Sequence, residues 1–372
     1  MTGRTATAAN RLGLDYAVEA RRMGAPPVPI IDAHAHINGG EASKVWARAA
    51  DLFGIDRVYS QTQLAQAADV KAVLGDRIRF VAIPEYMAED RKHAFTQGFL
   101  DNLEVWRERW GARMVKFWGA PRLRDYAKDI GVPADELAPF DTEWRLKIAF
   151  RARELGMALM VHVADPDTWF ATKYTDARTY GTKRDQYESL HRLLDETGMA
   201  CLGAHMGGWP EDLGFLTELL ARHPKLVLDT SATKWMVREL SKHPREDLLA
   251  FLERHAGRIL FGSDIVTHDD HLVRTDADDP KFGAQLANSA DEAFDLYASR
   301  YWALRTMFES EYEGESPIAD PDLAMVDPGR YDAMSGPRLS GKRLPAEVLS
   351  VLYRGAAAGT VERWYDEGVS GV

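Results

Sequence analysis

The stretch Ile30–Ile37, IIDAHAHI, decides how the rest of the chain is interpreted. Its side chains alternate faces as in a β-strand, so Asp32, His34 and His36 share one face and smaller apolar residues take the other. Two such imidazoles can bind one divalent ion, and a single added carboxylate completes a common hydrolytic ligand set. Two nearby histidines alone are weak evidence, so the prediction depends on what the other strands carry.

Short apolar runs alternate with helical patterns along the chain, which is typical of parallel strands joined by crossover helices. Eight such runs occur, at residues 29–37, 55–60, 78–83, 113–118, 158–164, 201–205, 226–231 and 259–265. We therefore expect an α/β protein with a (β/α)8 TIM-barrel fold. An open doubly wound sheet is the alternative, but no Gly-rich phosphate loop follows the first strand.

Three connections are longer than a crossover helix requires, and all follow strand C-termini, where barrels build their active sites. They are residues 119–143, 165–187 and 267–344, after the fourth, fifth and eighth strands. The last contains a predicted helix at 291–309. We expect residues 1–28 to form an N-terminal helical extension and 29–372 to form one barrel domain, with 267–344 covering its mouth.

Composition restricts the partners. The chain has 46 Lys and Arg against 57 Asp and Glu, a net charge of −11, which argues against a nucleic-acid or anionic-membrane surface. Its one cysteine, Cys201, excludes an internal disulfide. No window approaches the roughly 20 apolar residues of a membrane helix. We expect a cytoplasmic protein that binds a small molecule, with a homodimer left open.

Ligand-type residues end three further strands: His162 in MVHVAD, His205 in GAHMGG and Asp264 in FGSDIV. Catalytic groups of a barrel come from the ends of several strands, so these residues together indicate a metal site. A bound cation acidifies its water and polarises a substrate oxygen. Asp264 can accept the proton of that water, and His205 can stabilise an oxyanion or act as an acid. A second metal ligand is the alternative for His205.

The motifs IIDAHAH, MVHVAD, LGAHMGG, LVLDTSA and ILFGSD resemble those of the amidohydrolase superfamily. In detail they resemble its amidohydrolase-related branch, which includes aminocarboxymuconate semialdehyde decarboxylase. The resemblance implies one divalent ion, Zn2+ first and Mn2+ second, and a catalytic histidine at His205. It also implies a set of four metal ligands: His34, His36, His162 and Asp264.

The resemblance leaves two reactions open on the same site. In hydrolysis, activated water attacks an amide, a lactone or a carbonyl-activated C–C bond of a small carboxylated substrate. In non-oxidative decarboxylation, the metal anchors an unsaturated or aromatic acid while Asp264 or His205 protonates the carbon that loses CO2. We expect hydrolysis first, because some decarboxylases of the branch replace the first histidine with an acid and this chain keeps His34. A non-catalytic metal-binding barrel is the third alternative.

The remaining candidates are less specific. Lys116 ends the fourth strand, where some amidohydrolases bridge two metals with a carboxylated lysine. The alternatives for Lys116 are a neutral buried lysine and a cation that binds a substrate carboxylate. We expect one metal. Asp32 is expected to orient a metal-bound histidine or to form a salt bridge. His268 and His271 lie in a polar loop, where we expect solvent exposure in preference to the alternative of another metal site. Aromatic and basic residues near the mouth suit a planar acid and are candidate substrate contacts: Trp118, Arg122, Trp169, Trp209 and Lys234.

Overall fold

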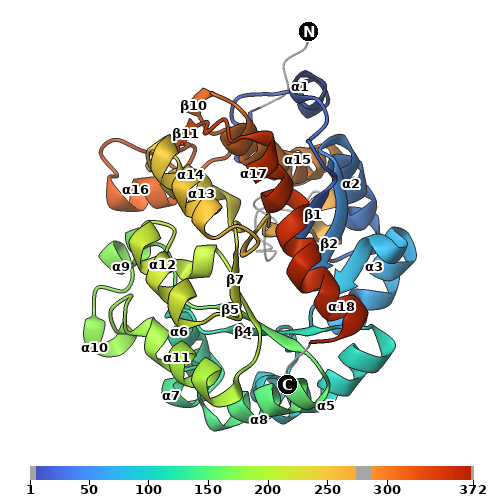
Figure 1. The fold of residues 1–372 in the computed structure, drawn as a ribbon, viewed down its shortest axis with the longest axis vertical. Coiled ribbons are helices and arrows are strands. Elements are labelled where there is room, and N and C mark those ends of the chain that lie inside the picture. Colours follow the sequence, from blue (N-terminus) through green and yellow to red (C-terminus); the bar gives the residue numbers. More distant parts are fainter. Residues whose placement is uncertain (1–5, 274–286, 370–372) are drawn as a thin grey trace. The chain divides into compact units, whose positions relative to one another are not determined.

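The computed structural model describes residues 6–273 and 287–369. The chain divides into two compact units, each containing parallel strands and helices (Figure 1). The first unit comprises Met1–Ser60, Gln66–Ile78 and Thr230–Ala357, and the second comprises Gln61–Ala65, Arg79–Asp229 and Ala358–Val372. The α/β class with parallel strands is confirmed. The closed eight-stranded ring and the single-domain boundaries stay predictions.

The parallel strands of the first unit centre on β1 (Ile30–His36), which pairs with β2 (Ile55–Ser60) and with β9 (Ile265–Val266). The short strand β8 (Ile259–Leu260) precedes β9. Several hydrogen bonds tie the segment between β8 and β9 to β1. Among them, the Ala33 amide donates to the Phe261 carbonyl and the Asp264 amide donates to the His34 carbonyl, each at 2.8 Å. This segment therefore brings Asp264 beside the histidines of β1.

The long helix α15 (Ala290–Glu309) is the main helix of the first unit and confirms the helix predicted at 291–309. Ser289 caps it by accepting a hydrogen bond from the Glu292 amide, as N-cap serines do. It packs against three other helices of this unit, α1, α2 and α13. The other helices of the first unit are α1 (Tyr16–Met23), α2 (Gly40–Leu52), α3 (Ala67–Leu74), α13 (Thr233–Leu240), α14 (Arg245–Arg254), α16 (Asp322–Val326) and α17 (Ala346–Ser350).

The predicted N-terminal helix is present as α1, which begins after Asp15; the Asp15 carboxylate accepts from the amides of Ala17 and Val18. Tyr16 at its start is fully buried, and α1 contacts both α2 and α15. The first unit also has an antiparallel pair, β10 (Glu313–Glu315) and β11 (Arg338–Ser340), within the segment predicted as an insertion. Part of that segment, 274–286, lies outside the described residues.

The second unit contains four parallel strands in the order β4, β5, β6 and β7. Their bounds are Met114–Trp118, Ala158–His162, Cys201–Gly203 and Leu226–Asp229. In register, Trp118 lies opposite His162, and Ala82, just beyond β3 (Ile78–Phe80), bridges to Val115. Strand order therefore follows chain order, as the alternation of strands and helices predicts.

Helices cover the strands of the second unit, and α8 packs against β4 and β5 (Figure 1). These helices are α4 (Arg91–Phe95), α5 (Gln97–Glu104), α6 (Arg122–Asp129), α7 (Ala134–Leu137), α8 (Glu143–Glu154), α9 (Asp167–Thr172), α10 (Ala177–Tyr180), α11 (Gln186–Thr197), α12 (Leu213–Arg222) and α18 (Arg363–Glu367). The predicted connections 119–143 and 165–187 contain α6 with α7 and α9 with α10. No described helix combines the length and apolarity needed to cross a membrane.

Candidate metal centre

Three potential ligands meet within the first unit. His34 and His36 lie on β1, and Asp264 lies just before β9. The Asp264 Oδ1 atom is 3.4 Å from His34 Nε2 and 3.2 Å from His36 Nε2. His34 is fully buried, whereas His36 and Asp264 expose 30% and 27% of their side chains. The triad is therefore open to solvent on one side, as a site that admits substrate must be.

The donor set of this triad fits a divalent cation. Two imidazole nitrogens and one carboxylate oxygen lie within 4.8 Å of one another. In a tetrahedral centre with metal–ligand bonds of about 2.0–2.1 Å, neighbouring ligand atoms are roughly 3.3 Å apart, close to the observed separations. The Ser231 hydroxyl lies 3.0 Å from His34 Nδ1. When Nδ1–H donates to that hydroxyl, Nε2 carries the lone pair on the side of Asp264.

Asp264 owes its position to an unusual backbone conformation. Its φ is +59°, in the left-handed region, which aspartate tolerates better than most residues. The turn interrupts the strand predicted at 259–265 and leaves β8 and β9 as separate short strands. Because the Asp264 amide still donates to the His34 carbonyl, the turn is anchored while the carboxylate faces both histidines.

Asp32 supports the backbone of the centre. Its carboxylate accepts hydrogen bonds from the Ser263 hydroxyl at 2.6 Å, the Tyr301 hydroxyl at 2.9 Å, the Ser263 amide at 3.0 Å and the His34 amide at 3.2 Å. Complete burial raises the pKa of Asp32 to about 7, although these bonds oppose the shift. Asp32 has no Lys or Arg ion pair within the described residues, so it fixes the backbone beside Asp264 instead of forming the alternative salt bridge.

His162 ends β5 in the second unit and has its own carboxylate partner there. Its Nε2 atom lies 3.2 Å from Asp165 Oδ1, and the Tyr174 hydroxyl donates to Asp165 Oδ2 at 2.7 Å. Such a partner fixes the ring and the tautomer of a ligating histidine. Neither Asp165 nor Tyr174 was selected from the sequence. Asp165 could have been, because it follows His162 within the MVHVAD motif.

His205 follows β6 in the second unit, and its ring contacts that of His162 edge-on at 4.6 Å between centroids. Its φ is +57°, and its amide donates to Asp229 Oδ1, at the end of β7, at 2.9 Å. Both His205 and Asp229 are buried. The ends of β5, β6 and β7 therefore bring His162, His205 and Asp229 together, and the role of His205 stays a prediction.

Lys116 lies on β4 and is only 4% exposed. It is near enough to Cys201 for its charge to oppose the rise in the pKa of that thiol, which burial causes. Burial and proximity to another strand fit any of the three roles considered for Lys116, so the expectation of a single metal is unaffected.

The candidate substrate contacts of the second unit largely pack against other side chains. Trp209 stacks on Tyr187, with 6.0 Å between ring centroids. The Lys173 ammonium lies 3.4 Å above the ring of Trp169. Arg122 opens α6 and lies close enough to Tyr174 to affect its pKa, and Trp118 contacts Tyr126. Their contact with substrate stays a prediction, as does that of Lys234 in the first unit.

The loop after β9 differs from expectation at one position. His268 is partly exposed, with 39% of its side chain accessible, and pairs with Asp270 at 3.1 Å. His271 is instead 1% exposed, and its Nδ1 lies 2.9 Å from the Tyr297 hydroxyl on α15. The prediction that His271 is exposed was wrong, because α15 covers the loop, and a polar local sequence does not reveal a helix from later in the chain.

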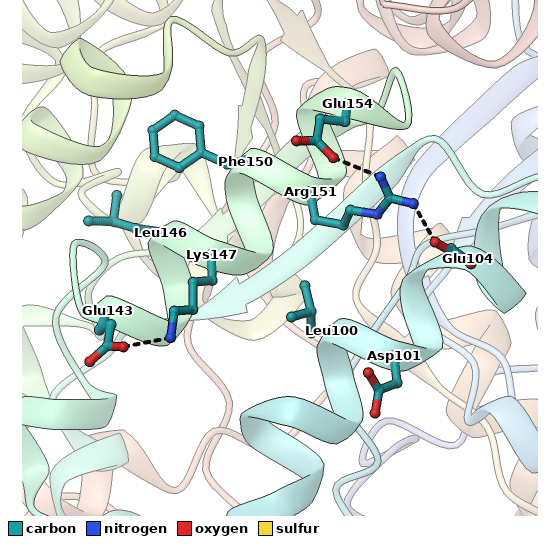
Figure 2. A pocket seen from close by; sticks show the side chains of 9 residues that line it. All are labelled: Leu100, Asp101, Glu104, Glu143, Leu146, Lys147, Phe150, Arg151 and Glu154. Carbon is teal, nitrogen blue, oxygen red and sulfur yellow. Dashed lines mark hydrogen bonds and ion pairs between the residues drawn. The ribbon is translucent and has the colours of Figure 1, made fainter.

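A separate surface pocket lies between α5 and α8 of the second unit (Figure 2). Lys147 pairs there with Glu143 at 2.6 Å, and Arg151 pairs with Glu154 at 2.7 Å and with Glu104. No histidine or cysteine is among the described residues that line it. Because both of its cations, Lys147 and Arg151, are already paired with carboxylates, this pocket is not the candidate site.

No protein-family model matches the sequence, and no curated protein matches it either. Solved structures with some likeness include 5-carboxyvanillate decarboxylase from Novosphingobium aromaticivorans, complexed with manganese: 12% identity over 98% of this chain and 99% of that chain, TM-score 0.43. A probable 2-pyrone-4,6-dicarboxylic acid hydrolase from Acinetobacter baumannii is 14% identical over 64% of this chain and 84% of that chain, with a TM-score of 0.41. A Bacillus D-hydantoinase is 18% identical over 64% of this chain and 58% of that chain, with a TM-score of 0.39. These enzymes include both expected reaction classes, but at these TM-scores the likeness does not indicate which reaction this chain catalyses.

Proposed function

We propose that this protein is a metal-dependent hydrolase of the amidohydrolase type that acts on a small carboxylated substrate. The observation that supports the proposal is the convergence of His34 Nε2, His36 Nε2 and Asp264 Oδ1 in the first unit. His162 is the fourth ligand of the proposal on the sequence argument alone, because it ends a parallel strand. The proposed fold is a closed (β/α)8 barrel with 267–344 at its mouth.

Two imidazoles and a carboxylate suit Zn2+ first and Mn2+ second. A divalent cation in such a site supplies a Lewis acid and acidifies water. The residues of the chain then handle protons. Asp264 has a second carboxylate oxygen that can accept a proton, and the leaving group takes its proton from Asp264 or from His205. Ser231 and Asp32 hold the ring and the backbone of His34, so the site is preorganised.

Metal content tests the centre directly. Mass-spectrometric metal analysis should find about one divalent ion per chain in the native protein, and His36→Gln or Asp264→Asn should reduce metal affinity at least roughly tenfold. The matched control is His268→Gln, which removes an imidazole from another His–Asp pair in the same unit and should leave metal content unchanged. A native protein without stoichiometric metal, or one in which all three variants bind equally, contradicts the proposal.

A substrate panel separates the reaction classes. Lactones, amides and unsaturated or aromatic acids should be incubated with chelated and with metal-reloaded protein, following water incorporation from H218O and CO2 release in parallel. Metal-dependent water incorporation supports hydrolysis. Metal-dependent CO2 release instead identifies the decarboxylase alternative, and a metal-loaded protein inactive on the whole panel points to the non-catalytic barrel.

A further inference from the structure

The start of helix α13 is attached to the metal-ligand strand and to the residue before Asp264. The Ser231 hydroxyl lies 3.0 Å from His34 Nδ1, and the Thr233 hydroxyl donates to the Ser263 carbonyl at 2.8 Å. Lys234 is the next residue and occupies the first turn of α13. The side chain of Lys234 therefore starts from backbone that is bonded to the centre.

Helix α15 reaches the same region from another direction. Arg300 and Tyr301 follow Tyr297 by three and four positions, so each is a neighbour of Tyr297 on the surface of α15. The Tyr301 hydroxyl donates to Asp32 and the Tyr297 hydroxyl contacts His271. Arg300 therefore lies beside Tyr297, which contacts the loop after β9, and α15 also packs against α13 and β9.

Charge effects agree with this placement. Burial lowers the pKa of Arg300 to about 10, while the nearby Tyr16, Asp264 and Tyr297 oppose the shift. Burial and the positive charge of Arg300 both lower the pKa of Lys234. Each cation is therefore close to another charged group of the region: Arg300 to Asp264, and Lys234 to Arg300.

Neither cation forms an ion pair with a carboxylate of the described residues, although Asp264 lies near Arg300. Arg300 Nη1 donates to the Leu296 carbonyl and the Ser299 hydroxyl, both at 2.9 Å and both uncharged. Lys234 forms no hydrogen bond or ion pair within the described part of the chain. The two carboxylates that raise its pKa, Asp320 and Asp322, are ion-paired with another cation, Arg238. Two partly buried cations near one another, without a paired anion, favour binding of an external anion.

We propose that Lys234 and Arg300 bind the substrate carboxylate next to the triad of His34, His36 and Asp264, and so select acids over their neutral analogues. This rests on the proposed function for the identity of the neighbouring site. Arginine presents a planar fork that matches a carboxylate, and lysine adds a point charge. The first turn of α13 adds positive potential, because its N-cap, Ala232, has no side chain that can accept from the helix amides.

The test compares benzoate with benzamide, two planar probes that differ in charge. Isothermal titration calorimetry with the full-length protein, with and without Mn2+, should give at least roughly tenfold tighter binding of benzoate. Lys234→Met and Arg300→Met should each weaken benzoate binding about 10- to 100-fold and leave benzamide unchanged, the range for losing a hydrogen bond to a charged group. The charge-preserving variant Arg300→Lys should retain part of the preference for benzoate, which keeps the test valid if Arg300→Met does not fold.

The matched control is Lys242→Met, which removes the same charge just beyond α13 from a side chain that is 65% exposed and paired with Glu239. It should bind benzoate as the native protein does. Equal affinity of the native protein for both probes, unchanged benzoate binding in the Lys234 and Arg300 variants, or equal losses for both probes would overturn the proposal. A native protein that binds no divalent metal but still prefers benzoate through these two residues refutes only the proposed metal-dependent function.

Discussion

Replacing Tyr301 with phenylalanine removes a single hydroxyl from the buried network below the metal centre. That hydroxyl donates to Asp32 Oδ2 at 2.9 Å and accepts from the indole Nε1 of Trp46 at 3.0 Å. Tyr301, Asp32 and Trp46 are all fully buried. Phenylalanine keeps the ring and its packing, so the change isolates the two hydrogen bonds.

The expected cost follows from these two partners. A hydrogen bond to a charged group contributes roughly 1.5–3 kcal/mol, and a buried donor left without a partner costs roughly 1–3 kcal/mol. Asp32 keeps three further donors, from Ser263 and His34, which limits the first contribution. We therefore expect Tyr301→Phe to lower the free energy of unfolding by about 3 kcal/mol, of which the orphaned Trp46 indole is a substantial part.

Urea denaturation of metal-free protein, followed by far-UV circular dichroism, measures this change without a contribution from metal binding. The control is Tyr312→Phe, whose hydroxyl donates to the Glu315 carbonyl in an exposed position, and we expect a loss of less than about 0.5 kcal/mol. Adding Trp46→Phe to Tyr301→Phe should cost less than the sum of the single changes, because both remove the same bond. A loss for Tyr301→Phe below about 1 kcal/mol would refute the reasoning about the network.

Three further predictions concern other parts of the chain. Burial lowers the pKa of His191 to about 4, so the folded protein holds a neutral ring. The contribution of this ring to the free energy of unfolding is complete above pH 6.5 and is lost as the pH falls toward 4. For this half-buried group we expect about 1 kcal/mol, measured as a pH-dependent difference in urea stability that His191→Gln removes. Cys201 is buried with a raised pKa, so Ellman's reagent should label it only after denaturation. Gly39→Ala places a Cβ 2.2 Å from Asp269 Oδ1 at φ +81° and should lower thermal stability by about 2 kcal/mol; Gly24→Ala, at φ +77° with open space around it, should cost less.

Periodicity predicted the strands well because it reports which face of a segment is buried. The runs at 55–60 and 113–118 correspond to β2 and β4 within one residue. The run at 259–265 does not, because a positive φ at Asp264 splits it into β8 and β9. Apolar alternation carries no information about the sign of φ, so FGSDIV looks like a continuous strand although its aspartate is at a turn.

The ligand triad could be predicted from the sequence because its members lie in motifs near the ends of predicted strands, where the order of motifs indicates their position. The groups that support it were not. Tyr301 contacts Asp32 across 269 positions of the chain, and Ser231 contacts His34 across 197. Tyrosine and serine are common residues, and a single sequence contains no signal that pairs them over such a distance. Arg300 was missed for the same reason, since it belongs to a helix inside a predicted insertion.

The proposed cation pair bears on the choice between the two reactions. A carboxylate bound by Lys234 and Arg300 keeps its charge, because both neighbours stabilise the ionised form. Loss of CO2 from that same carboxylate would require its negative charge to move into the carbon skeleton, away from the two cations. Interactions that are stronger in the ground state than in the transition state slow a reaction. A substrate with one carboxylate, bound by this pair, is therefore suited to hydrolysis elsewhere in the molecule, and a decarboxylase would need a second carboxylate outside the pair. Dicarboxylic and monocarboxylic aromatic acids should therefore differ. If a monocarboxylic acid released CO2 and this release required Lys234 and Arg300, the pair would be binding the carboxylate that is lost, not one that is retained.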